Sequence, residues 1–151
     1  MKDNSTVVEV RFEIEKDADG YPGSRDAEAL LCKPLDADCT VCVVASVPFY
    51  LRNVAYGDTV RAIEGSVSLL EFGGVVSRGG YSVYRMFLHD FSRKEQTIKD
   101  LLALGAVIEH DGRLIAIAIS EVNGPGAVLD YILEGKRQDR WGAQDGYIFE
   151  P

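Results

Sequence analysis

The sequence predicts an α+β protein in which a small β-barrel or curled antiparallel sheet is followed by a ferredoxin-like βαββαβ half. Three observations lead to this prediction. Short strand patterns follow one another through the first half with no helical pattern between them. Two helical patterns alternate with strand patterns in the second half, and Gly79-Gly80 stands where the change occurs. We therefore expect a barrel-like part at residues 1–78 and an α+β part at 79–151, packed as one compact unit.

The first strand is expected at residues 7–16. Apolar residues from Val8 to Ile14 alternate there with charged residues from Glu9 to Glu15. An alternation of period two is typical of a strand with one buried and one solvated face. The turn formers that follow, from position 17 to position 23, are expected to form a surface loop beside that charged face.

The other elements follow from β-branched runs, turn-forming pairs and helical periodicity. In the first half, further strands are expected at 30–34, 39–45, 58–64, 66–72 and 75–77. In the second half, the pattern predicts strands at 81–89, 106–110, 113–119 and 147–150, with helices at 93–104 and 125–134. Ser92 and Glu95 have the spacing of a capping box, and Gly135 is the expected stop of the second helix.

The acidic composition bounds the kind of partner. The 151 residues carry 16 Lys and Arg against 24 Asp and Glu, a net charge of −8. Residues 1–75 hold −6 of this charge, and residues 76–151 hold −2. A negative surface repels phosphate backbones and attracts cations, so we expect no nucleic acid and a cationic protein partner. Solubility alone is the alternative explanation of the charge.

The sequence shows no membrane-spanning segment and no export signal. No apolar run approaches the roughly 20 residues that cross a bilayer, and the polar start Met1–Thr6 lacks the apolar stretch of a signal peptide. We expect no membrane contact and a cytoplasmic location.

Three cysteines, Cys32, Cys39 and Cys42, make a disulfide framework improbable. The pair at 39 and 42 matches C-x-x-C, but positions three apart on a strand face opposite sides, so we expect buried thiols, no metal and no cofactor.

No catalytic motif is complete. The run Gly80-Tyr-Ser-Val-Tyr84 lacks the second glycine of a hydrolase nucleophile elbow, and the two histidines lack the spacing of a metal pair. A small enzyme is the alternative hypothesis, with His89, Asp90, Ser82 and Arg85 acting where the long strand meets the barrel. A ligand-sensing regulatory domain is a third hypothesis, based on fold analogy alone.

Six short phrases in the first 89 residues carry a family resemblance. They are Val10-Arg-Phe-Glu-Ile14, Asp19-Gly-Tyr-Pro22, Leu31-Cys-Lys-Pro-Leu35, Val47-Pro-Phe-Tyr50, Tyr56-Gly-Asp-Thr-Val60 and Gly80-Tyr-Ser-Val-Tyr-Arg85. Together they resemble a family of small bacterial proteins known only as a domain of unknown function. Tyr81 departs from the polar residue of the family's Gly-x-Ser phrase, which argues against a shared catalytic role. Some members are encoded beside polymorphic toxins, so the resemblance implies an immunity protein.

The leading hypothesis is a non-enzymatic immunity-type protein that binds a cationic toxin domain and occludes its active site. Its carboxylates would mimic the phosphates of the toxin's substrate, with aromatic side chains as anchors. The candidate contact residues are acidic or aromatic and are expected at the surface. They are Glu9, Glu13, Glu15, Asp17, Asp19, Tyr21, Asp36, Asp38 and Trp141.

Overall fold

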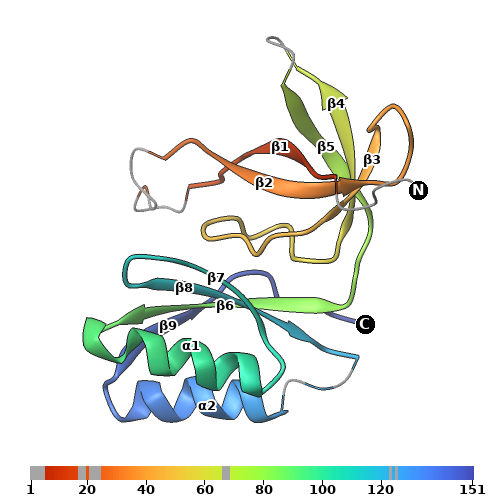
Figure 1. Ribbon diagram of the computed structural model, residues 1–151. Coiled ribbons are helices and arrows are strands. Elements are labelled where there is room, and N and C mark those ends of the chain that lie inside the picture. The colour runs from red at the N-terminus through yellow and green to blue at the C-terminus, as the bar shows by residue number, and fades with distance from the viewer. Residues whose placement is uncertain (1–5, 17–19, 21–24, 66–68, 123, 125) are drawn as a thin grey trace.

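The first half of the molecule is a closed barrel of five strands in chain order (Figure 1). The computed structural model describes residues 6–16, 20, 25–65, 69–122, 124 and 126–151. The barrel strands are β1 Val8–Glu13, β2 Ala27–Pro34, β3 Val41–Val44, β4 Thr59–Glu64 and β5 Leu70–Ser77. Each strand pairs antiparallel with the next, and β1 closes the barrel by pairing parallel with β5. A meander with an odd number of strands brings its first and last strands together in the same direction, so this closure has to be parallel.

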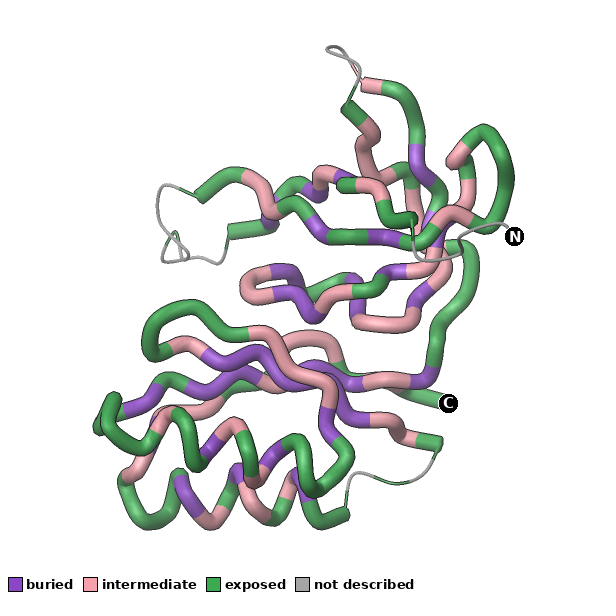
Figure 2. The backbone as a smooth tube through the Cα atoms, in the orientation of Figure 1, coloured by how far each residue is buried: buried purple, intermediate pink, exposed green. Residues whose placement is uncertain are grey.

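The barrel interior is filled by the apolar positions of the alternating strands. In β1, Val10 and Phe12 are buried while Glu9 and Glu13 are exposed, which confirms the period-two prediction for this strand. The Phe12 ring stacks on Phe72 of β5 with 4.6 Å between ring centroids. The tube coloured by burial shows buried positions alternating with exposed ones along the barrel strands (Figure 2). The strand itself is shorter than the expected 7–16.

The second half is a four-stranded sheet with two helices on the face away from the barrel (Figure 1). Its elements are β6 Tyr81–Leu88, α1 Lys94–Ala103, β7 Val107–Asp111, β8 Leu114–Ser120, α2 Gly126–Arg137 and β9 Trp141–Asp145, with a short 3-10 turn at Phe91–Arg93. The strands lie in the order β7-β8-β6-β9, and all neighbours are antiparallel. Side chains such as Met86, Ile117 and Ile132 form the core between sheet and helices. In the described part of the chain, no helix is long and apolar enough to cross a lipid bilayer.

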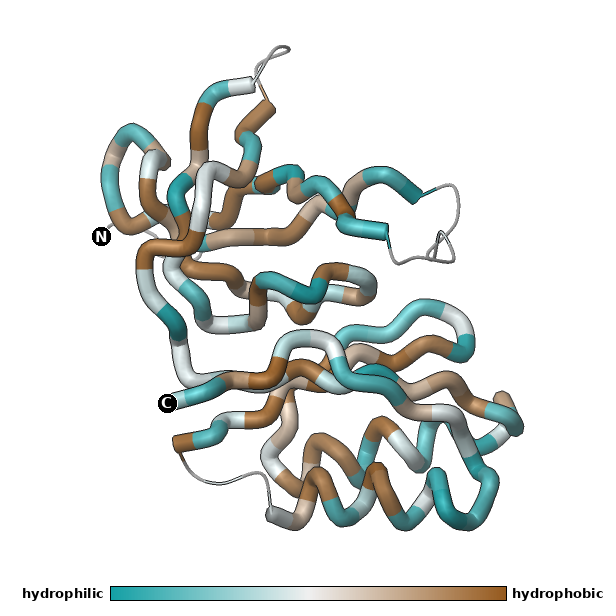
Figure 3. Tube along the Cα trace, turned by 180° about the vertical axis from the view of Figure 1, so that it is seen from behind, coloured by the Kyte–Doolittle hydropathy of each residue, from teal (hydrophilic) through white to brown (hydrophobic). Residues whose placement is uncertain are grey.

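The segment between β3 and β4, residues 45–58, lies between the barrel and the sheet (Figures 1 and 3). We call it the interlayer segment. Leu51 and Val54 of this segment belong to the barrel core, while Val47 and Ala55 pack with residues of the sheet, among them Val83. One stretch of irregular chain therefore contributes to two cores and couples the two halves.

Three local expectations are wrong for identifiable reasons. Gly73-Gly74 does not separate two strands but lies inside β5, where the register with β4 shifts. Gly74 has φ +118, a conformation that residues with a Cβ rarely adopt, so the glycine makes this irregularity possible. Helix α2 runs past Gly135 to Arg137. A Cβ at Gly135 would stand 1.9 Å from the Trp141 ring, so this glycine is a close-packing position rather than a stop. Asp90, not Ser92, provides the cap before α1: its carboxylate accepts from the Ser92 N–H at 3.0 Å.

The closing strand was expected at 147–150 and lies at 141–145. The chain from Gly146 onward still follows the start of β6, with Gly146 N–H donating to Val83 O and Val83 N–H to Tyr147 O, both at 2.7 Å. Two residues thus oppose Val83, and Phe149 N–H donates to the Ser82 hydroxyl rather than to a carbonyl. This bulged arrangement ends the strand ladder before the predicted residues.

Candidate functional site

The acidic face of β1 lines a groove on the outside of the barrel. The groove has a volume of about 370 Å³ and is lined by Arg11, Glu13, Glu15, Asn53, Ile63, Glu71 and Phe72. Strand β1 supplies the first two side chains, because odd positions in this strand point outward. Strands β4 and β5 supply an apolar floor, with Ile63 50% exposed. We call this set the barrel groove.

Charges in the barrel groove are unbalanced toward the negative. Arg11 pairs with Glu71 across the β1–β5 closure at 3.7 Å, and no ion pair among the described residues includes Glu13 or Glu15. Arg11 also stands between Glu9 and Glu13 on the outer face of β1. The glutamates of this face are therefore not consecutive, because the outward position between Glu9 and Glu13 is cationic.

Two further acidic candidates lie at the turn before β3. Asp36 and Asp38 are both exposed. The Asp36 carboxylate accepts from the Thr40 N–H at 2.8 Å and from the Thr40 hydroxyl. These bonds lower the pKa of Asp36, with the side-chain bond as the larger cause. Asp36 thus stabilises its own turn, whereas Asp38 is simply solvated.

The remaining candidates divide into two groups. Asp17, Asp19 and Tyr21 lie outside the described residues. Trp141 is 2% exposed, and its indole N–H donates to Ile132 O of α2 at 2.9 Å. Its ring is a core element that joins β9 to α2, so it does not present a surface to a partner. The cations that precede it in the sequence, Lys136 and Arg137, lie in the last turn of α2.

The residues of the alternative catalytic hypothesis serve structural contacts. Ser82 is fully buried, and its hydroxyl donates to Glu121 Oε2 at 2.6 Å. Arg85 is 3% exposed and donates to the carbonyls of Pro48 and Leu51 in the interlayer segment.

The other two members of that set lie at the far end of β6. The His89 ring Nδ1 lies 2.8 Å from Asp139 O, and Asp90 caps the 3-10 turn. His89 comes seven positions after Ser82, just past the end of β6, which corresponds to roughly 23 Å of extended chain. The structure therefore does not bring these four side chains into one site.

Charged residues that the sequence did not single out hold the interlayer segment. The Glu28 carboxylate of β2 accepts from Phe49 N–H at 2.6 Å and from Tyr50 N–H at 3.0 Å. Glu109 of β7 accepts from Val47 N–H, and burial raises the pKa of this carboxyl above its ordinary value. No spacing rule finds these contacts, because each joins a strand residue to irregular backbone far away in sequence.

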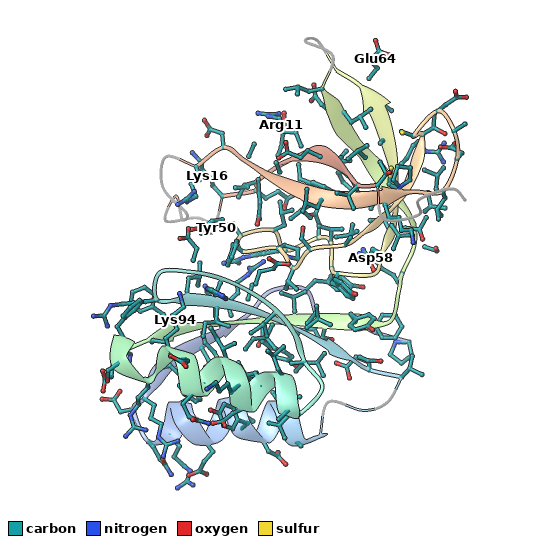
Figure 4. All side chains as sticks on the ribbon, in the orientation of Figure 1. Arg11, Lys16, Tyr50, Asp58, Glu64 and Lys94 are labelled. Carbon is teal, nitrogen blue, oxygen red and sulfur yellow. The ribbon has the colours of Figure 1, made fainter. Side chains whose placement is uncertain are left out.

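Asp58 is the most buried of these charges. It is 0% exposed and accepts from Ala55 N–H and Gly79 N–H, both at 2.9 Å. It also accepts from Arg78 Nη1 at 2.8 Å, so a cation compensates its burial. Asp58 is the last residue of the interlayer segment, and Figure 4 places it near the connection from the barrel to the sheet. The Tyr56-Gly-Asp phrase thus fixes the junction of the two halves.

Two of the three cysteine thiols are buried, and their burial raises their pKa values. Cys32 and Cys42 are buried in the barrel, as expected, while Cys39 is partly exposed at the turn before β3. Burial raises the pKa of Cys32 to about 12 and also raises that of Cys42. Among the residues that the structure describes, no group of three or more His, Cys, Asp or Glu side chains could hold a metal ion.

Comparison with known proteins places this chain by fold and by family. A hypothetical protein from Neisseria gonorrhoeae, known from a crystal structure, has the same fold with a TM-score of 0.70 and 15% sequence identity. The similarity covers 95% of this chain and 98% of that chain. A search of curated proteins finds no match. The family model described as "Domain of unknown function (DUF4265)" matches residues 28–143, so the chain belongs to the DUF4265 family.

Proposed function

We propose that this chain is a binding protein that takes a cationic protein partner on the barrel groove. The observation that carries the proposal is the composition of the groove: Glu13 and Glu15 stand over an apolar floor that includes Ile63 and Phe72. A carboxylate rim attracts a cationic side chain, and an apolar floor receives its aliphatic stem. The groove also lies in the half that holds most of the net negative charge.

The narrower form of the proposal is an immunity protein that neutralises a toxin in the bacterial cytoplasm by occluding its active site. The resemblance to a family with members beside polymorphic toxins supports this form. In that role the Glu13 and Glu15 carboxylates stand in for substrate phosphates against a basic cleft. Exposed carboxylates chiefly raise the association rate through long-range attraction, so binding depends on ionic strength.

The fold offers two halves with different roles under this proposal. We also propose that the second half is ferredoxin-like, which the order β7-β8-β6-β9 and the fully antiparallel pairing support. The division near residue 78 is supported by the end of β5 at Ser77 and the start of β6 at Tyr81. The barrel half then carries the partner surface, and the sheet half supports it through the interlayer segment.

A charge-reversal experiment tests the proposal. The probe is a bacterial toxin domain of positive net charge, and the measurement is its association rate with this chain by stopped flow at low and high salt. Replacing Glu13 and Glu15 with Lys should lower the rate at least about tenfold at low salt, with a smaller effect at high salt.

The matched control is the double variant Glu64→Lys and Glu95→Lys. It makes the same change in net charge, yet Glu64 lies at the tip of the β4–β5 hairpin and Glu95 lies in α1 (Figure 4). The control should retain most of the rate. An equal loss in both doubles would assign the effect to net charge alone, and an unchanged rate in the groove variant would remove the groove from the mechanism.

A further inference from the structure

The two edges of the four-stranded sheet differ in how they are protected. Strands β7 and β9 are the edges in the order β7-β8-β6-β9. Strand β7 ends in three ionisable residues, Glu109 to Asp111. Strand β9 reads Trp-Gly-Ala-Gln-Asp, so it holds neither lysine nor proline and has its one charge at the end. Proteins commonly blunt free edges with charges or proline, and β9 lacks this protection.

The hydrogen bonds at the two ends of β9 fix which of its backbone groups point outward. At one end, His89 N–H donates to Arg140 O at 3.0 Å, and at the other, Gly146 N–H donates to Val83 O at 2.7 Å. In an antiparallel pair, successive residues direct their N–H and C=O groups alternately toward and away from the neighbour. The even positions of β9 therefore face β6. Trp141, Ala143 and Asp145 direct theirs toward the open edge, where no described residue forms a second strand.

The sheet face next to this edge is hollow. A depression of about 330 Å³ is lined by residues of β6, β8 and β9, including Phe87, Gly142 and Gln144. Phe87 is 54% exposed although it belongs to a central strand. Gly142 pairs with Phe87, and no atom lies within 4 Å of the point where a Cβ at Gly142 would stand. A strand added to the edge has room for a side chain above Gly142.

We propose that β9 pairs antiparallel with β9 of a second copy of this chain, in a register centred on Ala143. A twofold axis at Ala143 lets the two Ala143 residues exchange both of their outward hydrogen bonds. The same register places Trp141 opposite Asp145 of the second copy. The outward N–H and C=O groups of these two residues can then form hydrogen bonds with each other. One continuous sheet of eight strands results.

The side chains suit a second copy in particular. In this register Gln144 of the second copy stands opposite Gly142, so its side chain extends over the bare backbone toward Phe87, and symmetry repeats the contact. The two Asp145 residues lie apart at opposite ends of the paired strands, so their like charges do not meet. Because helix α2 packs against β9, pairing of the two β9 strands also brings the two α2 helices toward each other. Leu133 of α2 is 51% exposed and is an apolar side chain available for contact there.

The first test is the oligomeric state of the full chain, measured by sedimentation equilibrium over a range of concentrations. The wild type should show a reversible monomer–dimer equilibrium. Ala143→Pro removes an outward N–H without touching the bonds to β6, so it should raise the dissociation constant at least about tenfold while leaving the fold intact. A monomer at every concentration up to about 1 mM, or a dimer unaffected by this variant, would overturn the proposal.

Amide hydrogen exchange gives a second readout that does not depend on a variant. In a monomer, the Ala143 and Asp145 amides should exchange fast and the Gly142 and Gln144 amides slowly. Pairing should protect both sets, so the alternation should fade as concentration rises. If the alternation persists in a dimer, the dimer uses another surface and the proposal fails. Protection by an unrelated extended peptide, with the chain itself monomeric, would also overturn the choice of a second copy.

Discussion

The inside of the barrel and the layer between barrel and sheet are built from different chemistry. The barrel core is wholly apolar and consists of residues such as Phe12, Leu30 and Val60. The layer combines small apolar residues, such as Ala116 and Ala118, with the buried charges of Asp58 and Arg85. Burial of apolar side chains stabilises the barrel and does not depend on their orientation. The charged side chains in the layer form directional hydrogen bonds with particular backbone groups.

The difference follows from the kind of chain in each region. Barrel strands satisfy their N–H and C=O groups through neighbouring strands. The interlayer segment has no ladder, so its buried backbone groups need side-chain partners. Glu28, Asp58, Arg85 and Glu109 supply them from four places in the sequence. Irregular chain can therefore occupy a buried layer when charged side chains replace the missing strand.

The largest expected effect is in the barrel core. Phe12→Ala removes a ring that is 1% exposed and stacked on Phe72, so it should lower the free energy of unfolding by about 3–5 kcal/mol. Because the interlayer segment belongs to both cores, unfolding should remain one cooperative transition for barrel and sheet. Chemical denaturation followed by fluorescence of Trp141, which lies in the sheet half, measures this. Separate transitions for the two halves would show that the layer does not couple them.

Removing a charge from the layer should have the next largest effect. Arg85→Met keeps a long side chain but leaves the Pro48 and Leu51 carbonyls without the guanidinium. We expect a loss of about 3 kcal/mol in the free energy of unfolding. Exchange of the amides in 47–53 should accelerate more than exchange in β1. If neither the free energy of unfolding nor the exchange of the 47–53 amides changed, apolar packing alone would hold the interlayer segment.

The backbones of Gly79 and Gly57 approach each other closely in the layer between barrel and sheet. A Cβ at Gly79 would stand 2.2 Å from the Gly57 carbonyl oxygen, where the connection to the sheet passes the interlayer segment. Gly79→Ala should therefore cost about 2 kcal/mol. Gly126→Ala is the control, because no atom lies within 4 Å of its Cβ position, and it should change stability little. Similar thermal midpoints for both variants would refute the tight packing of the junction.

The smallest expected effect concerns pH. Burial raises the pKa of Glu109, so its folded form holds a proton more readily than the unfolded chain does. This favourable contribution is complete below the unfolded value of about 4.3 and is lost as pH rises through the folded value. Glu109→Gln keeps an oxygen for Val47 N–H and should therefore leave stability unchanged at low pH and raise it by less than about 1 kcal/mol at pH 7.

The control for this prediction has the opposite sign. Arg137 lowers the pKa of the exposed Glu134, so Glu134→Gln should lose a little stability at neutral pH and none once acid has protonated the carboxyl. Urea denaturation at acid and neutral pH measures both variants. A destabilised Glu109→Gln protein at pH 7 would show that the charge on Glu109 itself holds the interlayer segment.

Much of the fold could be predicted because its strands carry local signals. The alternation in β1 and the Asp111-Gly112 turn between β7 and β8 are visible without tertiary context. Strand β9 could not be found in this way. Trp141 and Ala143 face the helices while Gly142 leaves its position on the other face bare, so the segment shows no alternation of apolar and polar residues.

The candidate site was predictable only in part. Charge and alternation identified Glu13 and Glu15, which the structure places in one groove. The groove also needs Asn53, Ile63 and Glu71, which come together only through closure of the barrel. The surface position expected for Trp141 is wrong, because its indole is buried against α2 and donates to Ile132 O.

The sequence by itself determined the α+β class, most strand positions, the two helices and the concentration of negative charge in the first half. These properties depend on residue type and on spacing within a few positions, where side-chain direction is set by the local backbone. Only the tertiary structure decided where β1 meets β5, how charged side chains hold the interlayer segment, and which strand remains at the open edge. Those features join residues that are far apart in the chain, and no local pattern encodes a contact whose two sides are chosen by the closure of the fold.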